Sequence, residues 1–380
     1  MPGHSDTRFD AAEVLRRLAR PRLVGTDGWH ATRETVRSLF AGLGYNSQTL
    51  PFDFSPVPGR CALPTAGAIL LLDSALCGAL LLADRPTPAL IITLAAGAAI
   101  ALIALSMPLA SDRLRWRALR GENLLFQRPG TRARWILMAH YDSKSQLVPL
   151  LLRAPAGFVG GLAWLVLTGI AVLGHIEPPG VAGPFIAGIA GMLAGAAFLF
   201  SWAGNASPGA LDNASGVATL LAVAAQDRGG DIAFLVSDAE EMGLVGARAA
   251  ARVLPDVEGV INIDGIDDTG EFRVFDRYGL PRRGTAPALR HALFAAARDA
   301  GVPITGRDAP VGILLDHMSI ARAGTPALTL LRGSLRSLAR VHLPQDDLQR
   351  LTGNGVNEAA ALLGRALHVL RGVAPSTDPR

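Results

Sequence analysis

The sequence is poor in cysteine, lysine and charge, and each shortage excludes a class of protein. Two cysteines, Cys61 and Cys77, are too few for a disulfide framework or a cysteine-rich zinc site. Lys144 is the only lysine, so the pI near 9.6 comes almost entirely from arginines. These are spread along the chain, whereas nucleic-acid binding would need them clustered with exposed aromatic side chains, so we expect no nucleic-acid partner. The first twenty residues are charged and have no apolar core, which argues against a cleavable signal peptide.

Only 18% of the residues are charged and half are apolar, which directs attention to membrane segments. Four long runs carry almost no charge, and each could cross a hydrocarbon core of ~30 Å as a helix. Helices buried in a large soluble core are the alternative, but four runs in two tight pairs favour two transmembrane hairpins, 63–110 and 154–202. The runs are Leu63–Ala83, interrupted by Asp73, then Thr87–Ala110, Ala154–Gly174 and Val181–Trp202.

Two hairpins return the chain to the side that it left. The remaining segments, 8–62, 111–150 and 203–372, would then form one discontinuous domain, followed by a flexible tail over 373–380. Arg85 is the only arginine in the loops on the opposite side, and positive charge favours the cytoplasmic side. We therefore expect this domain and both termini to be cytoplasmic. The arginines that flank the hairpins on the domain's side are Arg60, Arg113, Arg115, Arg117, Arg120 and Arg153.

Asp73 is the single acid within the apolar runs. Such a residue is either a functional intramembrane acid or a side chain that faces the interior of the helix bundle. The structural interpretation is favoured, because no partner for a functional role is evident nearby in the sequence.

Outside the hairpins, apolar strand-like runs alternate with helical patterns, which predicts an α/β fold. Expected strands include Trp135–His140, Asp231–Val236, Gly259–Ile263 and Ala327–Leu331, with helices over Ser215–Ala225, Leu244–Val253, Ala286–Ala300 and Gly355–Leu370. This alternation is typical of a mostly parallel central sheet covered by helices on both faces.

Histidine and acidic residues follow several of these strands. His140 and Asp142 end one strand, Glu240 and Glu241 follow another, and Asp264 follows a third. Sites in open α/β sheets lie beyond the carboxyl ends of the strands, so these side chains should converge. Together with Asp212, ahead of a helix, and His342, they indicate a metal site. Adjacent residues in an extended chain point opposite ways, so separate roles for Glu240 and Glu241 require a turn, which Gly243 favours.

Five motifs occur in an order that resembles the M28 family of zinc-dependent exopeptidases, an aminopeptidase-like group with two co-catalytic ions. They are His-Tyr-Asp at 140–142, Asp-Asn-Ala-Ser-Gly at 212–216, Glu-Glu-Met-Gly-Leu-Val-Gly at 240–246, Asn-Ile-Asp at 262–264 and His-Leu-Pro-Gln-Asp-Asp at 342–347. The opening segment from Leu18 to Gly25 is also similar to the start of such domains. The resemblance implies a three-layer α/β/α fold with the hairpins as insertions.

The resemblance also implies a role for each residue. Asp212 would bridge two Zn2+ ions, for which Co2+ or Mn2+ could substitute. Asp142 would orient the His140 imidazole, Glu240 would be the general base, and Asp316 and His317 would help to shape the substrate pocket. His317 also follows an aspartate and is the alternative to His342 as a ligand. The terminal ligands would be His140 and Asp264 on one ion and Glu241 and His342 on the other.

The implied function is a membrane-anchored aminopeptidase acting on peptides near the bilayer. Another amide hydrolase or a glutaminyl-cyclase-like enzyme on the same fold is an alternative, although cyclases resemble single-zinc enzymes and the presence of His140 argues against one. A non-catalytic membrane scaffold is a further alternative, which would predict the loss of a ligand or of the base. Every such position is filled. The sequence predicts no oligomeric state.

Overall fold

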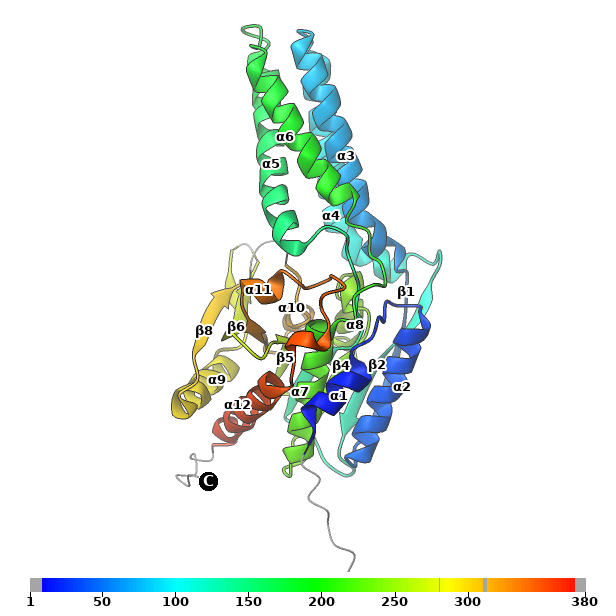
Figure 1. Ribbon diagram of the computed structural model, residues 1–380, viewed down its shortest axis with the longest axis vertical. Helices are drawn as coiled ribbons and strands as arrows, with labels where there is room; N and C mark the ends of the chain where they lie inside the picture. The colour runs from blue at the N-terminus through cyan, green and yellow to red at the C-terminus, as the bar shows by residue number, and fades with distance from the viewer. Residues whose placement is uncertain (1–8, 280, 310–312, 373–380) are drawn as a thin grey trace, which may run out of the picture. The chain divides into compact units, whose positions relative to one another are not determined.

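The computed structural model describes residues 9–279, 281–309 and 313–372, which form two compact units (Figure 1). The α/β unit comprises the chain up to Asp53, Leu119–Lys144 and the chain from Asn205 onward. The four-helix unit comprises Phe54–Ala118 and Ser145–Gly204. The tail predicted over 373–380 lies outside the described residues.

The α/β unit is built on one mixed sheet, in the order β1-β2-β4-β3-β5-β9-β6-β7, with β8 paired to β6. The central strands β4, β3, β5 and β9 run parallel, whereas the pairs β2–β4, β6–β9 and β6–β7 are antiparallel. The predicted α/β class is confirmed, with parallel pairing concentrated at the centre. The strands are β1 Asn46–Phe54, β2 Leu119–Gln127, β3 Trp135–His140, β4 Ile232–Ser237, β5 Gly259–Ile266, β6 Glu271–Tyr278, β7 Arg283–Gly284, β8 Ile304–Asp308 and β9 Ala327–Gly333.

The register of the central strands brings their carboxyl ends to one edge. His140 at the end of β3 pairs with Ser237 at the end of β4, and Met138 pairs with Asn262 of β5. Asp264 therefore lies about level with His140, since both stand two residues past that last pair. Every residue of β3 and β4 is buried, as expected for strands covered on both faces.

Helices cover both faces of this sheet. Phe234 of β4 packs against Phe40 of α2 (Asp27–Gly42), whereas its neighbours Ala233 and Leu235 share a core cluster with α8 (Val245–Ala250) and α10 (His317–Arg322). Successive strand residues point to opposite faces, so α2 and α8 lie on opposite sides. The remaining helical segments are α1 Ala11–Leu18, α7 Ser215–Gln226, α9 Pro287–Ala300, α11 Leu335–Leu338, α12 Asn354–Leu370, η1 Ala210–Ala214, η2 Glu240–Met242 and η3 Leu348–Arg350.

The four-helix unit contains the segments 63–110 and 154–202, which the sequence predicts as hairpins. All four helices are long and apolar enough to cross a membrane. They extend beyond the predicted runs at several ends. At the starts of α3 and α4, Pro58 and Pro86 occupy first-turn positions, where the backbone needs no hydrogen-bond donor. The helices are α3 Val57–Leu82, α4 Pro86–Arg113, α5 Leu150–Leu173 and α6 Ala182–Leu199.

Glycines allow α3 and α6 to pack closely. A Cβ added at Gly191 would stand 2.2 Å from the Ser74 hydroxyl oxygen, and one at Gly195 would stand 2.5 Å from the Leu71 amide nitrogen. Both distances are shorter than any real contact, so only glycine fits at these positions. Small residues at such interfaces are typical of helices that associate in lipid.

Asp73 faces the interior of this unit, as the structural interpretation predicts. Its side chain is 3% exposed, and its two carboxylate oxygens accept from the Thr93 hydroxyl at 2.9 and 3.1 Å. The Thr93 carbonyl in turn accepts from the Trp164 indole N–H at 2.8 Å. These bonds link α3, α4 and α5.

Each hairpin is closed at its base. Ser145 and Gly204 exchange two backbone hydrogen bonds of 2.8 Å, which close the hairpin formed by α5 and α6. Ser55 closes the other hairpin, because its amide donates to the Ser111 carbonyl at 2.9 Å and its hydroxyl to the Trp116 carbonyl at 2.8 Å. Each hairpin therefore begins and ends at a position where its two ends are joined by hydrogen bonds.

Candidate metal centre

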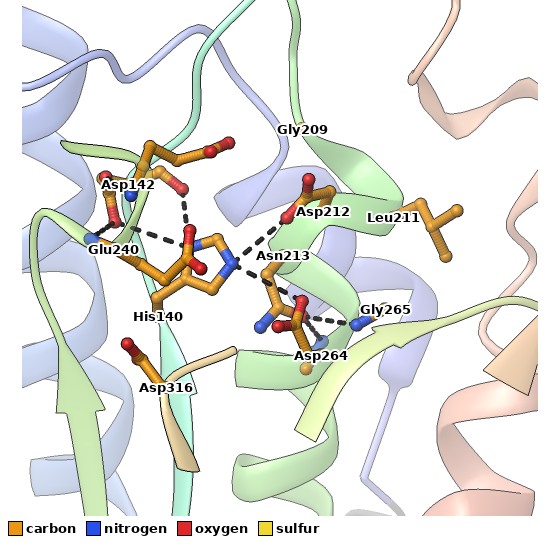
Figure 2. A network of polar contacts seen from close by, with 12 residues as sticks. His140, Asp142, Gly209, Leu211, Asp212, Asn213, Glu240, Asp264, Gly265 and Asp316 are labelled. Atoms are coloured by element: carbon orange, nitrogen blue, oxygen red, sulfur yellow. Dashed lines mark hydrogen bonds and ion pairs between the residues drawn. The ribbon is translucent and has the colours of Figure 1, made fainter. Parts of the chain in front are cut away.

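Two groups of potential ligands share Asp212. One Asp212 carboxylate oxygen lies 3.1 Å from His140 Nε2, which is 3.7 Å from an oxygen of Asp264 (Figure 2). The other Asp212 oxygen lies 3.1 Å from His342 Nε2, which is 3.2 Å from Glu241 Oε1. Within each group the ligand atoms lie within 4.8 Å of one another. The structure thus brings together all five residues that the resemblance implied as ligands.

The five residues come from the carboxyl edge of the sheet and the loops beside it. His140 ends β3, Asp264 lies near the end of β5, and Glu241 lies in η2, directly after β4. Asp212 lies in η1, where the Asp212–Asn213 peptide is cis, and His342 has a φ of +65° in the loop after α11. Local pattern places the strand residues, whereas the fold alone brings His342 to them.

The donor set fits two divalent ions. His140 Nε2 and Glu241 Oε1 are buried and make no hydrogen bond, although charged groups surround them. Such orphaned atoms, directed into a cluster of carboxylates, are what a metal position requires. Nitrogen and oxygen donors without thiolate suit zinc, and a carboxylate shared by two groups suits a pair of ions.

The charges of the acids depend on the histidines. Burial by itself raises the pKa of Asp212, but the His140 and His342 imidazoles, each 3.1 Å away, outweigh it and hold that pKa well below the usual range. Burial acts in the same direction on Glu241, and the charges of His342 and Lys144 reverse it, which lowers its pKa to about 2. Both carboxylates are therefore ionised and available as ligands at neutral pH.

Asp142 supports both sides of the site. Its carboxylate accepts from the amides of Glu240 and Glu241 at 3.0 and 3.1 Å, so it fixes the start of η2. One of its oxygens also lies 3.4 Å from His140 Nδ1, while that nitrogen lies 3.2 Å from the Asp142 carbonyl. The sequence predicted the orientation of the imidazole, and the structure adds the contacts to the turn.

Glu240 and Glu241 diverge at the predicted turn. Ala239, Gly243 and Leu244 have φ values of +52°, +95° and +62°, which reverse the chain around the pair. Glu241 is directed to His342, whereas Glu240 lies beside His140 and Asp142 (Figure 2). Burial and the neighbouring acids raise the pKa of Glu240 well above its usual value, with the charge of His140 opposing them. A carboxyl group in this setting is able to hold a proton near neutral pH.

The adjacent side chains of Asp316 and His317 lie in different surroundings. The Asp316 carboxylate accepts from the Ser237 hydroxyl at 2.6 Å and lies on the His140 side of the centre (Figure 2). Burial raises its pKa to about 7. His317 is also buried, which lowers its pKa to about 3, and its Nδ1 lies 2.7 Å from the Thr329 hydroxyl of β9. Among the described residues, His317 belongs to neither ligand group.

Three residues near the centre had no role from sequence reasoning, and Asp346 is the first. Its carboxylate accepts from the amides of Leu211 and Asp212 at 2.7 and 3.1 Å, so it holds the loop that presents the shared ligand. The signal for it was the His-x-Pro-x-Asp pattern that begins at His342.

Arg22 is the second, and it is completely buried. Its guanidinium donates to the carbonyls of Tyr141, Pro208 and Gly209, and so joins the segment after β3 to the loop before Asp212. Gly209 has a φ of +58°, and a Cβ there would lie 3.0 Å from the guanidinium. Burial lowers the pKa of Arg22 to about 10, so it stays charged at neutral pH. The opening segment from Leu18 to Gly25 was its only signal.

Lys144 is the third. Its ammonium nitrogen lies 2.7 Å from Glu241 Oε2. The sequence feature that could have pointed to Lys144 is that it is the only lysine in the chain.

A model of peptidase family M28 matches residues 123–367. The chain belongs to peptidase family M28. The resemblance predicted from the five motifs is therefore confirmed. No curated protein resembles this M28 chain closely enough to match it.

Solved structures share the fold of this M28 chain. The glutaminyl cyclase of Fimbriiglobus ruber is 16% identical, with 95% of this chain and 94% of that chain covered and a TM-score of 0.55. A leucine aminopeptidase precursor from Bacteroides thetaiotaomicron is 14% identical, covering 95% and 97%, with a TM-score of 0.56. An aminopeptidase from Aneurinibacillus sp. strain AM-1 is 15% identical, covering 95% and 94%, with a TM-score of 0.55. At these identities the likeness establishes the fold and leaves the reaction open.

Proposed function

We propose that this M28 chain is a membrane-anchored, dinuclear zinc exopeptidase, an aminopeptidase that removes N-terminal residues from peptides. The observation that carries the proposal is that the two carboxylate oxygens of Asp212 face two different histidines, His140 and His342, each at 3.1 Å. A carboxylate in this position is suited to bridge two ions. Membership of peptidase family M28 supports a hydrolytic reaction. Aminopeptidases are among the solved structures that share the fold, which supports an aminopeptidase in particular.

The residues of the chain divide the work. Two zinc ions, when bound, supply Lewis acidity that polarises a peptide carbonyl and lowers the pKa of water. Glu240 accepts the proton of the attacking water and delivers it to the leaving amine, which its raised pKa favours. Asp142 fixes the turn that presents Glu240, and Asp316 borders the His140 side.

The membrane anchor would be the four apolar helices, with the α/β unit and both termini on the cytoplasmic side. The chain passes directly from Lys144 into one hairpin, two residues after Asp142. This connection favours peptides whose N-terminus is presented near the bilayer. Matched free and lipid-tethered peptides should therefore differ in kcat/KM, and equal values would contradict this part of the proposal.

Glutaminyl-cyclase activity is the second candidate, because solved cyclases share the fold. Cyclisation of an N-terminal glutamine on a single zinc would fit the His140 or the His342 group alone. The count of bound ions and the product formed from a glutamine-starting peptide separate the two reactions.

The decisive experiment measures zinc content and peptidase activity of the purified full chain, as wild type and as Glu240→Gln. We expect about two zinc per chain in both proteins, and a loss of activity of roughly 100-fold or more in the variant. Glu258→Gln, on the exposed surface, is the matched control and should behave as wild type. One zinc with cyclised product would favour the cyclase. A chain that binds no zinc and cleaves no peptide would favour a non-catalytic scaffold, and activity unchanged in Glu240→Gln would contradict the role of Glu240 as the general base.

A further inference from the structure

Five consecutive residues at the end of α4 are exposed and alternate between arginine and apolar side chains. The segment 113–117, which we call the basic segment, reads Arg-Leu-Arg-Trp-Arg, and each of its side chains is exposed. Trp116 is 61% exposed, although tryptophan is highly buried on average in folded proteins. The basic segment therefore presents three guanidinium groups and two apolar side chains at the surface of the four-helix unit.

The backbone of the basic segment is held in place. The Leu114 amide donates to the Ala110 carbonyl at 2.9 Å, as the last bond of α4. The Trp116 carbonyl accepts from the Ser55 hydroxyl at 2.8 Å. Arg117 then has a φ of +52°, and its guanidinium lies 5.3 Å from the centroid of the Trp116 ring. The arginines and the tryptophan are thus presented together by a defined turn.

The length of α4 sets the depth of the basic segment in a bilayer. The part of α4 that is apolar enough to cross a membrane ends at Met107, and Arg113 stands six residues further on, about 9 Å along a helix. A bilayer of about 40–45 Å has a hydrocarbon core of about 30 Å, so each headgroup layer is about 5–8 Å thick. The basic segment therefore lies at or just beyond the headgroups of the leaflet in which α4 ends. Exposed tryptophan is typical of this interface.

Positive charge gathers around the basic segment. The base of the hairpin formed by α3 and α4, residues 54–65 and 105–118, contains four arginines and a single acid, Asp112. Arg60 of α3 stands close enough to Arg117 for their charges to interact. Like charges gathered in this way repel one another, and an anion bound among them offsets that repulsion. The base of this hairpin is therefore suited to an anionic ligand.

The base of the other hairpin differs in charge. Residues 145–155 and 199–204, where α5 begins and α6 ends, contain Arg153 as their only charged residue, and its side chain is 8% exposed. Trp202 is exposed there, at 53%. Each base thus presents a tryptophan, but only the base of α3 and α4 surrounds it with exposed arginines. Trp202 therefore serves as an internal control for lipid contact that does not depend on charge.

We propose that the basic segment binds the headgroup of an anionic phospholipid in preference to a zwitterionic one. Its three guanidinium groups pair with the phosphate oxygens, for which their planar forks are suited. Trp116 packs at the boundary with the acyl chains. The tryptophan favours a lipid over an acidic peptide, because it places an apolar surface beside the charges at the depth of the headgroups. This inference rests on the membrane anchor of the proposed function and is independent of the peptidase reaction.

The test places the full chain in nanodiscs of phosphatidylcholine. A minor fraction of the lipid is replaced by phosphatidylglycerol or phosphatidylcholine with brominated acyl chains, because bromine quenches tryptophan fluorescence at short range. The quenching that is lost in Trp116→Phe reports the lipid beside the basic segment. We expect this signal to favour phosphatidylglycerol by roughly 5-fold or more, as about one arginine in contact with an anionic headgroup would give. The quenching that is lost in Trp202→Phe should show no such preference.

Two sets of substitutions separate charge from structure. Replacing all three arginines of the basic segment by glutamine should abolish the preference, whereas replacing them by lysine keeps the charge and should retain most of it. The matched control removes the same charge from three exposed arginines of the α/β unit and should leave the preference unchanged. The control arginines are Arg16, Arg283 and Arg298. Soluble glycerol 3-phosphate, which has the phosphate without acyl chains, should not compete.

The outcomes separate this inference from the proposed function. Equal quenching of Trp116 by the two lipids would overturn the inference, as would a preference that survives in the glutamine variant or disappears in the control. Competition by glycerol 3-phosphate would overturn a lipid as the ligand and indicate a soluble phosphate compound. Peptidase activity of the same samples tests the proposed reaction separately. A chain that alkaline carbonate washes from membranes would contradict the membrane anchor of the proposed function, and this inference with it.

Discussion

Replacing Arg22 by lysine should destabilise the α/β unit although the charge is retained. The guanidinium donates to the carbonyls of Tyr141, Pro208 and Gly209 from three different nitrogens, and it is completely buried. One ammonium nitrogen cannot reach three carbonyls that a planar fork spans, so we expect at least two of them to lose their donor. A buried acceptor without a partner costs about 1–3 kcal/mol, so two of them give a loss of about 2–6 kcal/mol.

Thermal unfolding of the metal-free full chain in detergent measures this loss. For a unit of this size, about 1 kcal/mol shifts Tm by about 2–4 °C, so Arg22→Lys should lower the Tm of the α/β unit by roughly 4–24 °C. The matched control is Arg298→Lys, because its exposed side chain makes only a 4.0 Å ion pair with Asp299. That variant should unfold within about 1 °C of wild type.

The same variant should also bind zinc less tightly. Arg22 joins the segment after His140 to the loop before Asp212, so its loss loosens the spacing between two ligands. Partners of this kind are worth about 10–100-fold in metal affinity. If Arg22→Lys unfolded within 2 °C of wild type, the three bonds would not be holding the loops together, and the reasoning would be wrong.

Three further changes test other parts of the structure. Gly191→Leu should prevent recovery of a folded four-helix unit from membranes, because its Cβ has no room beside α3. Gly169→Leu, where a Cβ meets nothing within 4 Å, should behave as wild type in size-exclusion chromatography. Asp346→Asn offers one acceptor oxygen to two backbone amides, so zinc affinity should fall by roughly 10-fold, measured by chelator competition. The hydrogen bond from Arg371 lowers the pKa of Asp231. This ion pair therefore stabilises the fold fully above the ordinary aspartate pKa near 3.8, and the stabilisation is lost as the pH falls through the lowered pKa of Asp231. Arg371→Gln should therefore destabilise the chain at pH 7 and match wild type at acid pH; an equal difference at both would rule out this ion pair as the cause.

Local sequence was sufficient for the parts of the site that follow strands. His140, Glu241 and Asp264 come directly after apolar runs, and parallel pairing carries such residues to one edge. The turn at Glu240 also followed from local geometry, because two adjacent acids with different roles require one. Tertiary contacts decided the rest, since the loop of His342 has no periodicity that predicts where it packs.

The elements that the sequence did not predict lack a periodic apolar pattern. Strand β8 is short, lies off the main path of the sheet and is only partly buried, so it carries no alternation to read. Arg22 and Lys144 are single basic residues whose partners lie 119 and 97 positions away along the chain. Only the folded chain shows that one serves carbonyls and the other a ligand.

The pairing of Ser145 with Gly204 determines where residues can be added to or removed from this chain. Two backbone hydrogen bonds already join its sides, so everything from Gln146 to Ala203 forms a closed excursion from the α/β unit. An excursion that starts and finishes at one paired position can be lengthened, shortened or replaced by a tight turn without shifting the residues on either side. The fold is thus open to insertions of long apolar helices at this point, although the segment separates His140 from Asp212 in the sequence.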